Sequence, residues 1–271
     1  MNRRKITSLL ALVLAIGMFT AASVQGSAGS TLILDKFNAK NATALIEHLP
    51  DEDALGNGWF VELGDWIAEK GKAKELSTAP WNVSSDYRAL IDSGESDVSA
   101  ELQLKMDMDG DQFWGVVARY SGPTDWLMAF HDGVGDLILG KKFTDEDQYG
   151  NPGATYFQEL GRVSMDWKSG QKAKTHTIKI VTADTTITVF ADDEPVISAV
   201  DHGDMTSGVV GIFSRGQGKN QFKQFEVKLP DSGSGYSASP TTTHEGGDGN
   251  GKDHEYDDSK HGDDEGKDGK D

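Results

Sequence analysis

The sequence predicts an all-β protein, a sandwich of two antiparallel sheets. From Thr31 onward, short runs either alternate between apolar and polar residues or are apolar throughout, which is typical of strands. Gly, Asp, Asn and Pro separate these runs at short intervals, as in a series of hairpins. The sole helix-like stretch, Ala42–Leu49, has room for one or two turns at most.

The predicted strands in chain order are Thr31–Phe37, Trp59–Leu63, Trp66–Lys70, Asp97–Met106, Phe113–Tyr120, Trp126–His131, Leu137–Lys142, Arg162–Asp166, His176–Thr182, Thr185–Ala191, Glu194–Val200, Gly208–Ser214 and Gln221–Leu229. The separators Asp107–Gln112, Ala183-Asp184 and Asp192-Asp193 are short and polar, which favours hairpin turns. The segment Thr144–Thr155 is polar and contains Asn151-Pro152, so we expect a long loop at the rim of the sandwich.

One predicted hairpin has two very different faces. If Tyr120 pairs with Trp126, alternation places large apolar residues on one face, namely Trp114, Val116, Ala118, Tyr120, Trp126, Met128 and Phe130. The opposite face then carries small residues and two polar groups, namely Gly115, Val117, Arg119, Leu127, Ala129 and His131. We expect the first face to join the core and the second face to present a binding surface.

The two ends of the chain differ in composition from the body. Residues 1–26 have a basic start followed by the apolar run Leu9–Phe19 and small residues, which predicts a signal peptide; a retained amino-terminal anchor is the alternative. Residues 231–271 hold twelve acids against four lysines, a charge of −8, and lack Leu, Ile and Val. Such a tail cannot bury enough apolar surface to fold, so we expect disorder. The domain between them, 27–230, is large enough for one core.

Charge and cysteine content limit the partners. The formal net charge of the chain is −18 and the chain has no cysteine. Nucleic acid and anionic membranes are poor partners for an acidic surface, whereas cations, neutral glycans and basic proteins fit it. Export without cysteine favours a prokaryotic source, and a secreted, periplasmic or cell-surface location. Disulfides and thiol catalysis are excluded.

An ordered series of motifs resembles a known family. The series runs from Asp35-x-Phe37 and the Trp59/Trp66 pair through Gly115-Val-Val-Ala-Arg-Tyr120 to Gly208-Val-Val-Gly-Ile-Phe213 and Phe222-Lys-Gln-Phe-Glu-Val227. In this order it resembles the concanavalin A-like, laminin-G-like jelly roll of exported bacterial proteins, over about Thr31–Leu229. The resemblance implies a jelly-roll sandwich of two antiparallel sheets. It leaves function open among lectins, adhesion modules and glycan-cleaving enzymes.

Catalytic motifs of that superfamily are not visible. Its laminarinase-type members carry acids at alternate positions of one strand, about 5 Å apart. The strand that would host them, Ala100–Asp107, has Glu101 and Asp107 but no such set. Zinc-protease, serine-hydrolase and nucleotide-binding motifs are also missing. An enzyme remains open only if acids converge from separate strands.

Two kinds of site are predicted. Asp107, Asp109 and Asp111 surround Gly110 and could supply three oxygens to a structural calcium; a polar hairpin turn is the alternative reading. Arg119 and His131 are the expected ligand residues of the open face, with an internal ion pair as the alternative. Trp81, beside Pro80, is the tryptophan that we expect to be exposed for sugar stacking.

These observations favour an exported, non-catalytic recognition module that binds glycan or a cell-surface polymer on its concave sheet. Two alternatives remain open at this point. One is a glycoside hydrolase or lyase with unconventional acidic residues, and the other is a structural matrix or adhesion protein. Twelve carboxylates and three histidines in the tail favour loose binding of divalent cations there.

Overall fold

The chain folds into the predicted jelly-roll β-sandwich of two antiparallel sheets. The computed structural model describes residues 29–77, 86–105, 113–145, 153–167, 174–201, 205–216 and 221–231, so the signal segment and all of the tail after Asp231 lie outside it. Within these ranges the helical content is the 3-10 turn η1 (Leu45–Glu47), inside the predicted helix-like stretch. No helix in the described residues is long and apolar enough to cross a membrane.

The described residues form strands with these bounds: β1 (Thr31–Asp35), β2 (Thr43–Ala44), β3 (Glu52–Asp53), β4 (Phe60–Leu63), β5 (Trp66–Ala68), β6 (Ala73–Glu75), β7 (Tyr87–Asp92), β8 (Ser99–Lys105), β9 (Phe113–Gly122), β10 (Asp125–His131), β11 (Asp136–Asp145), β12 (Ala154–Ser164), β13 (Thr175–Ala183), β14 (Thr186–Ala191), β15 (Glu194–Val200), β16 (Val209–Arg215) and β17 (Gln221–Lys228).

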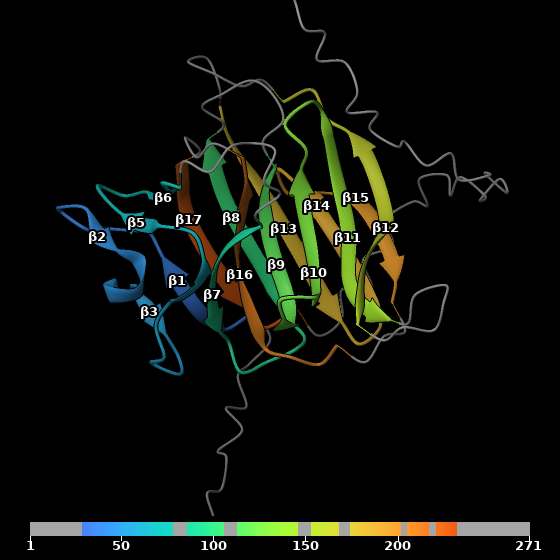
Figure 1. Cartoon of the computed structure of the whole chain (residues 1–271), viewed down its shortest axis with the longest axis horizontal. Helices are drawn as coiled ribbons and strands as arrows, with labels where there is room; N and C mark the ends of the chain where they lie inside the picture. Colours follow the sequence, from blue (N-terminus) through green and yellow to red (C-terminus); the bar gives the residue numbers. More distant parts are fainter. Residues whose placement is uncertain are drawn as a thin grey trace, which may run out of the picture.

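The two sheets lie one over the other (Figure 1). The seven-stranded sheet has the order β12-β11-β10-β9-β16-β7-β4. The ten-stranded sheet has the order β15-β14-β13-β8-β17-β6-β5-β2, and β1 joins it between β17 and β3. Strands far apart in sequence are neighbours in both sheets, as β9 and β16 are, which is how a jelly roll differs from a simple meander.

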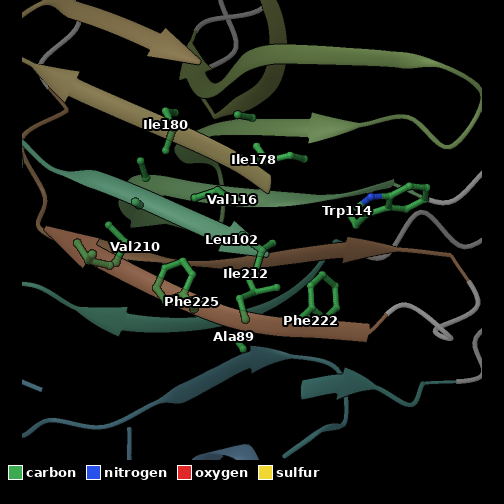
Figure 2. Packing of buried hydrophobic residues seen from close by; sticks show 14 of the residues in the cluster. Ala89, Leu102, Trp114, Val116, Ile178, Ile180, Val210, Ile212, Phe222 and Phe225 are labelled. Atoms are coloured by element: carbon green, nitrogen blue, oxygen red, sulfur yellow. The ribbon is translucent and has the colours of Figure 1, made fainter. Parts of the chain in front are cut away.

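The main core lies between the sheets. Figure 2 shows Leu102 and Phe225 of the ten-stranded sheet and Val116 and Ile212 of the seven-stranded sheet in one apolar cluster. All four side chains are buried. At about 25 cal/mol per Å² of apolar surface removed from water, this interior is the main source of stability in a chain without disulfides.

Several predicted boundaries need correction. Strand β7 was not predicted, because its residues are almost all buried and the Tyr-Arg-Ala-Leu-Ile-Asp run shows no clear alternation. The predicted loop Thr144–Thr155 is strand at both ends, since Thr144 pairs with Thr155 and Asp145 with Ala154. The residues of this part of the hairpin are mostly polar, so the sequence lacks the apolar alternation that marks a half-buried strand.

The predicted register of the β9–β10 hairpin is wrong by one residue. Ala118 pairs with Leu127, and Asp125 pairs with Gly122, so that three β9 residues, 119–121, lie opposite Trp126. Arg119 has a φ of 49°, in the left-handed region, which accommodates this bulge. A shift of one residue exchanges the two faces of a strand. Trp126, Met128 and Phe130 therefore point away from the main core, while Leu127 and Ala129 belong to it.

Candidate functional site

The outer face of the seven-stranded sheet carries a second apolar cluster. Its buried members come from five adjacent strands: Leu90, Val117, Tyr120, Trp126, Met128, Phe130, Ile138 and Phe213. The outer face of an antiparallel sandwich is ordinarily polar and in contact with water. On this face the apolar side chains are buried, which sets it apart from an ordinary outer face.

A cavity of about 510 Å³ opens on this cluster. Its lining residues are Phe113, Met128, Phe130, Asp132, Val134, Ile138, Lys142, Phe157, Arg162, Phe213 and Arg215. Ligand-binding clefts in proteins have volumes of roughly 300–1,000 Å³, with an apolar lining and a few placed polar groups. We call this cavity, with these residues, the outer cavity.

The floor of the outer cavity is an interlocked set of aromatic rings. The Phe130 ring centroid lies 5.4 Å from that of Phe113 and 5.9 Å from that of Phe213, the second pair being edge to face. Trp126 packs against Phe213 with a centroid distance of 5.5 Å. Edge-to-face contacts are favourable for aromatic pairs, so the rings of the floor support one another.

Phe157 of β12 forms an aromatic wall of the cavity. The residue is 48% exposed, and its ring stands edge to face with Phe130 at a centroid distance of 6.3 Å. The ring lies over Gly140 of the neighbouring strand. A Cβ atom on Gly140 would be 2.4 Å from Cε2 and 2.5 Å from Cζ of Phe157. The missing side chain at position 140 therefore lets the ring lie on the sheet with one part open to water.

Cations along one side of the cavity gather around a buried carboxylate, Asp86. Arg215 donates to Oδ1 of Asp86 from Nε at 2.7 Å and from Nη2 at 2.5 Å. Lys142 donates from Nζ to Oδ2, and Nη1 of Arg88 lies 3.9 Å from the same oxygen. Arg88 also donates from Nε to Glu62 at 2.5 Å.

The same cations lie against the aromatic rings. The Arg88 guanidinium is 5.0 Å and the Lys142 ammonium 5.3 Å from the Trp126 ring centroid. The Arg215 guanidinium lies 5.0 Å from the Phe113 ring. Cation–π contacts of this kind hold long side chains in place beside the floor.

A polar loop, residues 132–136, lies on the opposite side of the cavity. Oδ1 of Asp132 accepts the backbone N–H groups of Val134, Gly135 and Asp136 at 2.9–3.0 Å. Arg162 donates to Asp136 at 2.7 Å and to Glu159 at 2.7 and 3.1 Å. The hydrogen bond from Arg162 lowers the pKa of Asp136, so this pair stays ionised at neutral pH.

The structure places Arg119 away from the outer cavity. Its side chain is buried, and its Nη2 donates to Asp97 Oδ1 at 2.7 Å and to the Asp184 carbonyl at 2.6 Å. Its Nε donates to the Ser96 carbonyl at 3.1 Å. Arg119 thus ties the seven-stranded sheet to the β7–β8 connection and to the β13–β14 turn, which is the internal ion pair of the alternative reading.

His131 lies in a stack of rings at one end of the main core, not on an open face. It stacks on Trp114 at 5.1 Å and on Trp167 at 5.4 Å, and Trp167 stacks on His176 at 4.4 Å. Nδ1 of His131 accepts the Gly133 N–H at 3.0 Å, while Nε2 has no partner among the described residues. Burial lowers the pKa of His131, so the ring is neutral at pH 7.

The other predicted site residues lie outside the described ranges. These are Trp81 and the proposed calcium ligands Asp107, Asp109 and Asp111. The described residues contain no group of three or more His, Cys, Asp or Glu side chains placed to hold a metal. The structural calcium and the exposed tryptophan stay predictions.

Acidic residues do meet on the ten-stranded sheet. Glu101 of β8 and Glu226 of β17 are directly paired across the ladder, and they line a hollow of about 190 Å³ with Lys179 and Lys228. Burial raises the pKa of Glu101. Each carboxylate has a lysine nearby, with Nζ of Lys228 3.0 Å from Glu226 and Nζ of Lys179 3.9 Å from Glu101.

Sequence reasoning missed the residues of the outer cavity. It assigned Trp126, Met128 and Phe130 to the main core through the register error, and it did not consider Phe157, Lys142 or Arg215. The sequence did mark two of these residues, Lys142 and Arg215, as unusual. Lys142 and Arg215 are cations at the ends of strands rich in apolar residues, in a chain whose formal charge is −18.

Solved structures with a similar fold include carbohydrate-binding proteins. The carbohydrate-binding module CBM66 from Bacillus subtilis has a TM-score of 0.39 and 13% identity, covering 64% of this chain and 92% of its own. LamAcat from Zobellia galactanivorans has a TM-score of 0.46 and 7% identity, covering 73% and 97%. A galectin from Caenorhabditis elegans has a TM-score of 0.36 and 12% identity, covering 54% and 91%.

These likenesses, with TM-scores below 0.5, say nothing about the ligand or reaction of this chain. No protein-family model matches the chain, and no curated protein matches its sequence.

Proposed function

We propose that this chain is an exported, non-catalytic recognition module that binds glycan in the outer cavity of its seven-stranded sheet. The carrying observation is the half-exposed Phe157 ring, which lies on Gly140 beside the aromatic floor. A flat, partly exposed aromatic face suits the apolar C–H face of a sugar ring. Charged groups at the margin, such as Lys142 and Arg215, suit its hydroxyl groups.

The experiment compares Phe157→Ala with Phe60→Ala. Both phenylalanines are on strands of the same sheet and have similar exposure, 48% and 40%, but Phe60 does not line the cavity. Affinity electrophoresis and calorimetry with laminarin, xylan and polygalacturonate measure binding. We expect Phe157→Ala to weaken binding about tenfold, because the ring no longer covers apolar surface of the sugar. Equal affinities for the two variants would contradict the proposal.

A glycoside hydrolase is the alternative class of function, and the paired Glu101 and Glu226 are its candidate acids. Glu101 and Glu226 are directly opposed on adjacent strands, so their carboxylates can approach each other, as the pair in a retaining glycosidase must. The hollow they line is only about 190 Å³, below the usual range for a ligand cleft. We therefore expect no release of reducing sugar. Turnover that is abolished by Glu101→Gln would establish the hydrolase instead.

A further inference from the structure

We propose that the glycan bound in the outer cavity is acidic, and that Lys142 and Arg215 hold a carboxylate or sulfate group of the sugar. This inference rests on the proposed function, since it names the class of glycan that the same cavity takes.

The side of the cavity that carries Lys142 and Arg215 differs in charge from the chain as a whole. The lining contains three cations, Lys142, Arg162 and Arg215, and one carboxylate, Asp132. The chain as a whole has a formal charge of −18. Because Arg162 is paired with Asp136 and Glu159, the unbalanced positive charge of the lining lies at Lys142 and Arg215, and a positive spot in an acidic protein favours a ligand with negative charge there.

The cations around Asp86 exceed the acids that pair with them. Arg88, Lys142 and Arg215 share the two oxygens of Asp86, and Glu62 adds one more carboxylate through Arg88. Among the described residues, three positive charges thus face two negative ones in a partly buried cluster. An anion from a ligand would balance this excess positive charge.

Among the described cations of the lining, Arg162 is paired with more carboxylates than Lys142 or Arg215. Arg162 is held by Glu159 through Nε and Nη2 and by Asp136 through Nη1. Lys142 has an ammonium with one described hydrogen bond, and Arg215 bonds to Asp86 through Nε and Nη2 alone. Within the described ranges, Nη1 of Arg215 and two of the three Lys142 ammonium hydrogens have no acceptor.

Their exposure fits this role. The side chains of Lys142 and Arg215 are 19% and 32% exposed, whereas Arg88 behind them is buried. Because Phe113 and Phe130 lie beside Arg215, a sugar ring on the aromatic floor would bring an acid group to these two cations.

The remaining negative charge of the protein does not prevent this contact. At 0.15 M salt the Debye length is about 8 Å, so distant carboxylates are screened while a direct ion pair at the cavity is not. We expect binding of acidic glycan to persist at 0.15 M salt and to weaken at 1 M, where the Debye length is about 3 Å.

The test measures Kd for polygalacturonate oligomers, which carry carboxylates, dextran sulfate, which carries sulfates, and neutral laminarin. The variants are Lys142→Gln and Arg215→Gln, each checked by thermal melting. The control is Lys74→Gln, which removes another lysine of an ion pair, on the other sheet. We expect about a tenfold loss of affinity for an acidic polymer in both cavity variants and no loss in the control.

The outcomes separate this inference from the proposed function. If only polygalacturonate binds, the ligand group is a carboxylate, and if only dextran sulfate binds, it is a sulfate. Either result supports the inference, provided that Lys142→Gln and Arg215→Gln weaken that binding. In a third outcome, laminarin binds as tightly as polygalacturonate and dextran sulfate. If Phe157→Ala then weakens laminarin binding while Arg215→Gln and Lys142→Gln do not, the acidic ligand is refuted and glycan binding stands. If no glycan binds the intact chain, both fail.

Discussion

Substituting Gly140 by alanine should displace the Phe157 ring while the fold stays intact. The added Cβ would lie 2.4 Å from Cε2 and 2.5 Å from Cζ, whereas its nearest backbone neighbour, the Gln158 carbonyl, is at 3.5 Å. The ring end is the far part of a half-exposed side chain, so it can swing outward at little cost. Alanine is also better than glycine in a strand by about 0.5–1 kcal/mol. We therefore expect the free energy of unfolding to change by less than about 1 kcal/mol.

Glycan affinity should change far more than stability. A phenylalanine residue that is 48% exposed presents about 100 Å² to a ligand. A sugar ring stacked on one face would cover about half of this area, which contributes about 1.3 kcal/mol, or about tenfold in Kd. Calorimetry on the wild type and Gly140→Ala measures this difference, and urea unfolding measures the stability.

Two further variants make this prediction sharp. Gly122→Ala is the matched control, since a Cβ there has no neighbour within 4 Å, and it should change neither Kd nor stability. In the double variant Gly140→Ala/Phe157→Ala, the first change should have no further effect because the ring is gone. Wild-type affinity in Gly140→Ala, or full additivity in the double variant, would refute the role of the ring as a stacking platform.

Three other predictions concern stability. Arg119→Lys should lower the free energy of unfolding by about 2–4 kcal/mol, because the carbonyls of Ser96 and Asp184 lose their donors; a urea midpoint unchanged from wild type would contradict it. The folded-state pKa of His131 is lowered, so the free energy of unfolding should fall as pH drops below about 6.5, where the unfolded chain takes up the proton. The slope of the free energy of unfolding against pH should be smaller in His131→Phe, and equal slopes in the two proteins would count against this. Gly115→Ala should destabilise the fold by more than about 3 kcal/mol, measured by thermal melting, since its Cβ would lie 2.0 Å from a backbone carbonyl; a melting temperature like that of Gly122→Ala would count against it.

The architecture could be predicted from the sequence because alternation and turn residues act locally. The predicted turn at Asp192-Asp193 is a hairpin turn in the structure, and the turn predicted at Ala183-Asp184 lies one residue further on, at Asp184-Thr185; Asp184, Asp192 and Asp193 have positive φ. Strand β7 was missed because it is buried on both faces and therefore lacks a period.

The site could not be predicted, because it depends on a single bulge. Alternation assumes a regular strand, and the left-handed conformation of Arg119 breaks that assumption without a glycine or proline to mark it. The resulting register places Met128 and Phe130 on the outer face. The contacts of Asp86 with cations from β7, β11 and β16 join residues far apart in sequence, so no local pattern could reveal them.

Backbone amide shifts measured by NMR during a titration with polygalacturonate oligomers test the central claim most directly. The account predicts saturable shift changes confined to the outer face of the seven-stranded sheet, around Phe130, Gly140, Lys142, Phe157 and Arg215. Changes centred on Glu101 and Glu226 of the other sheet, or no change at saturating oligomer, would contradict it.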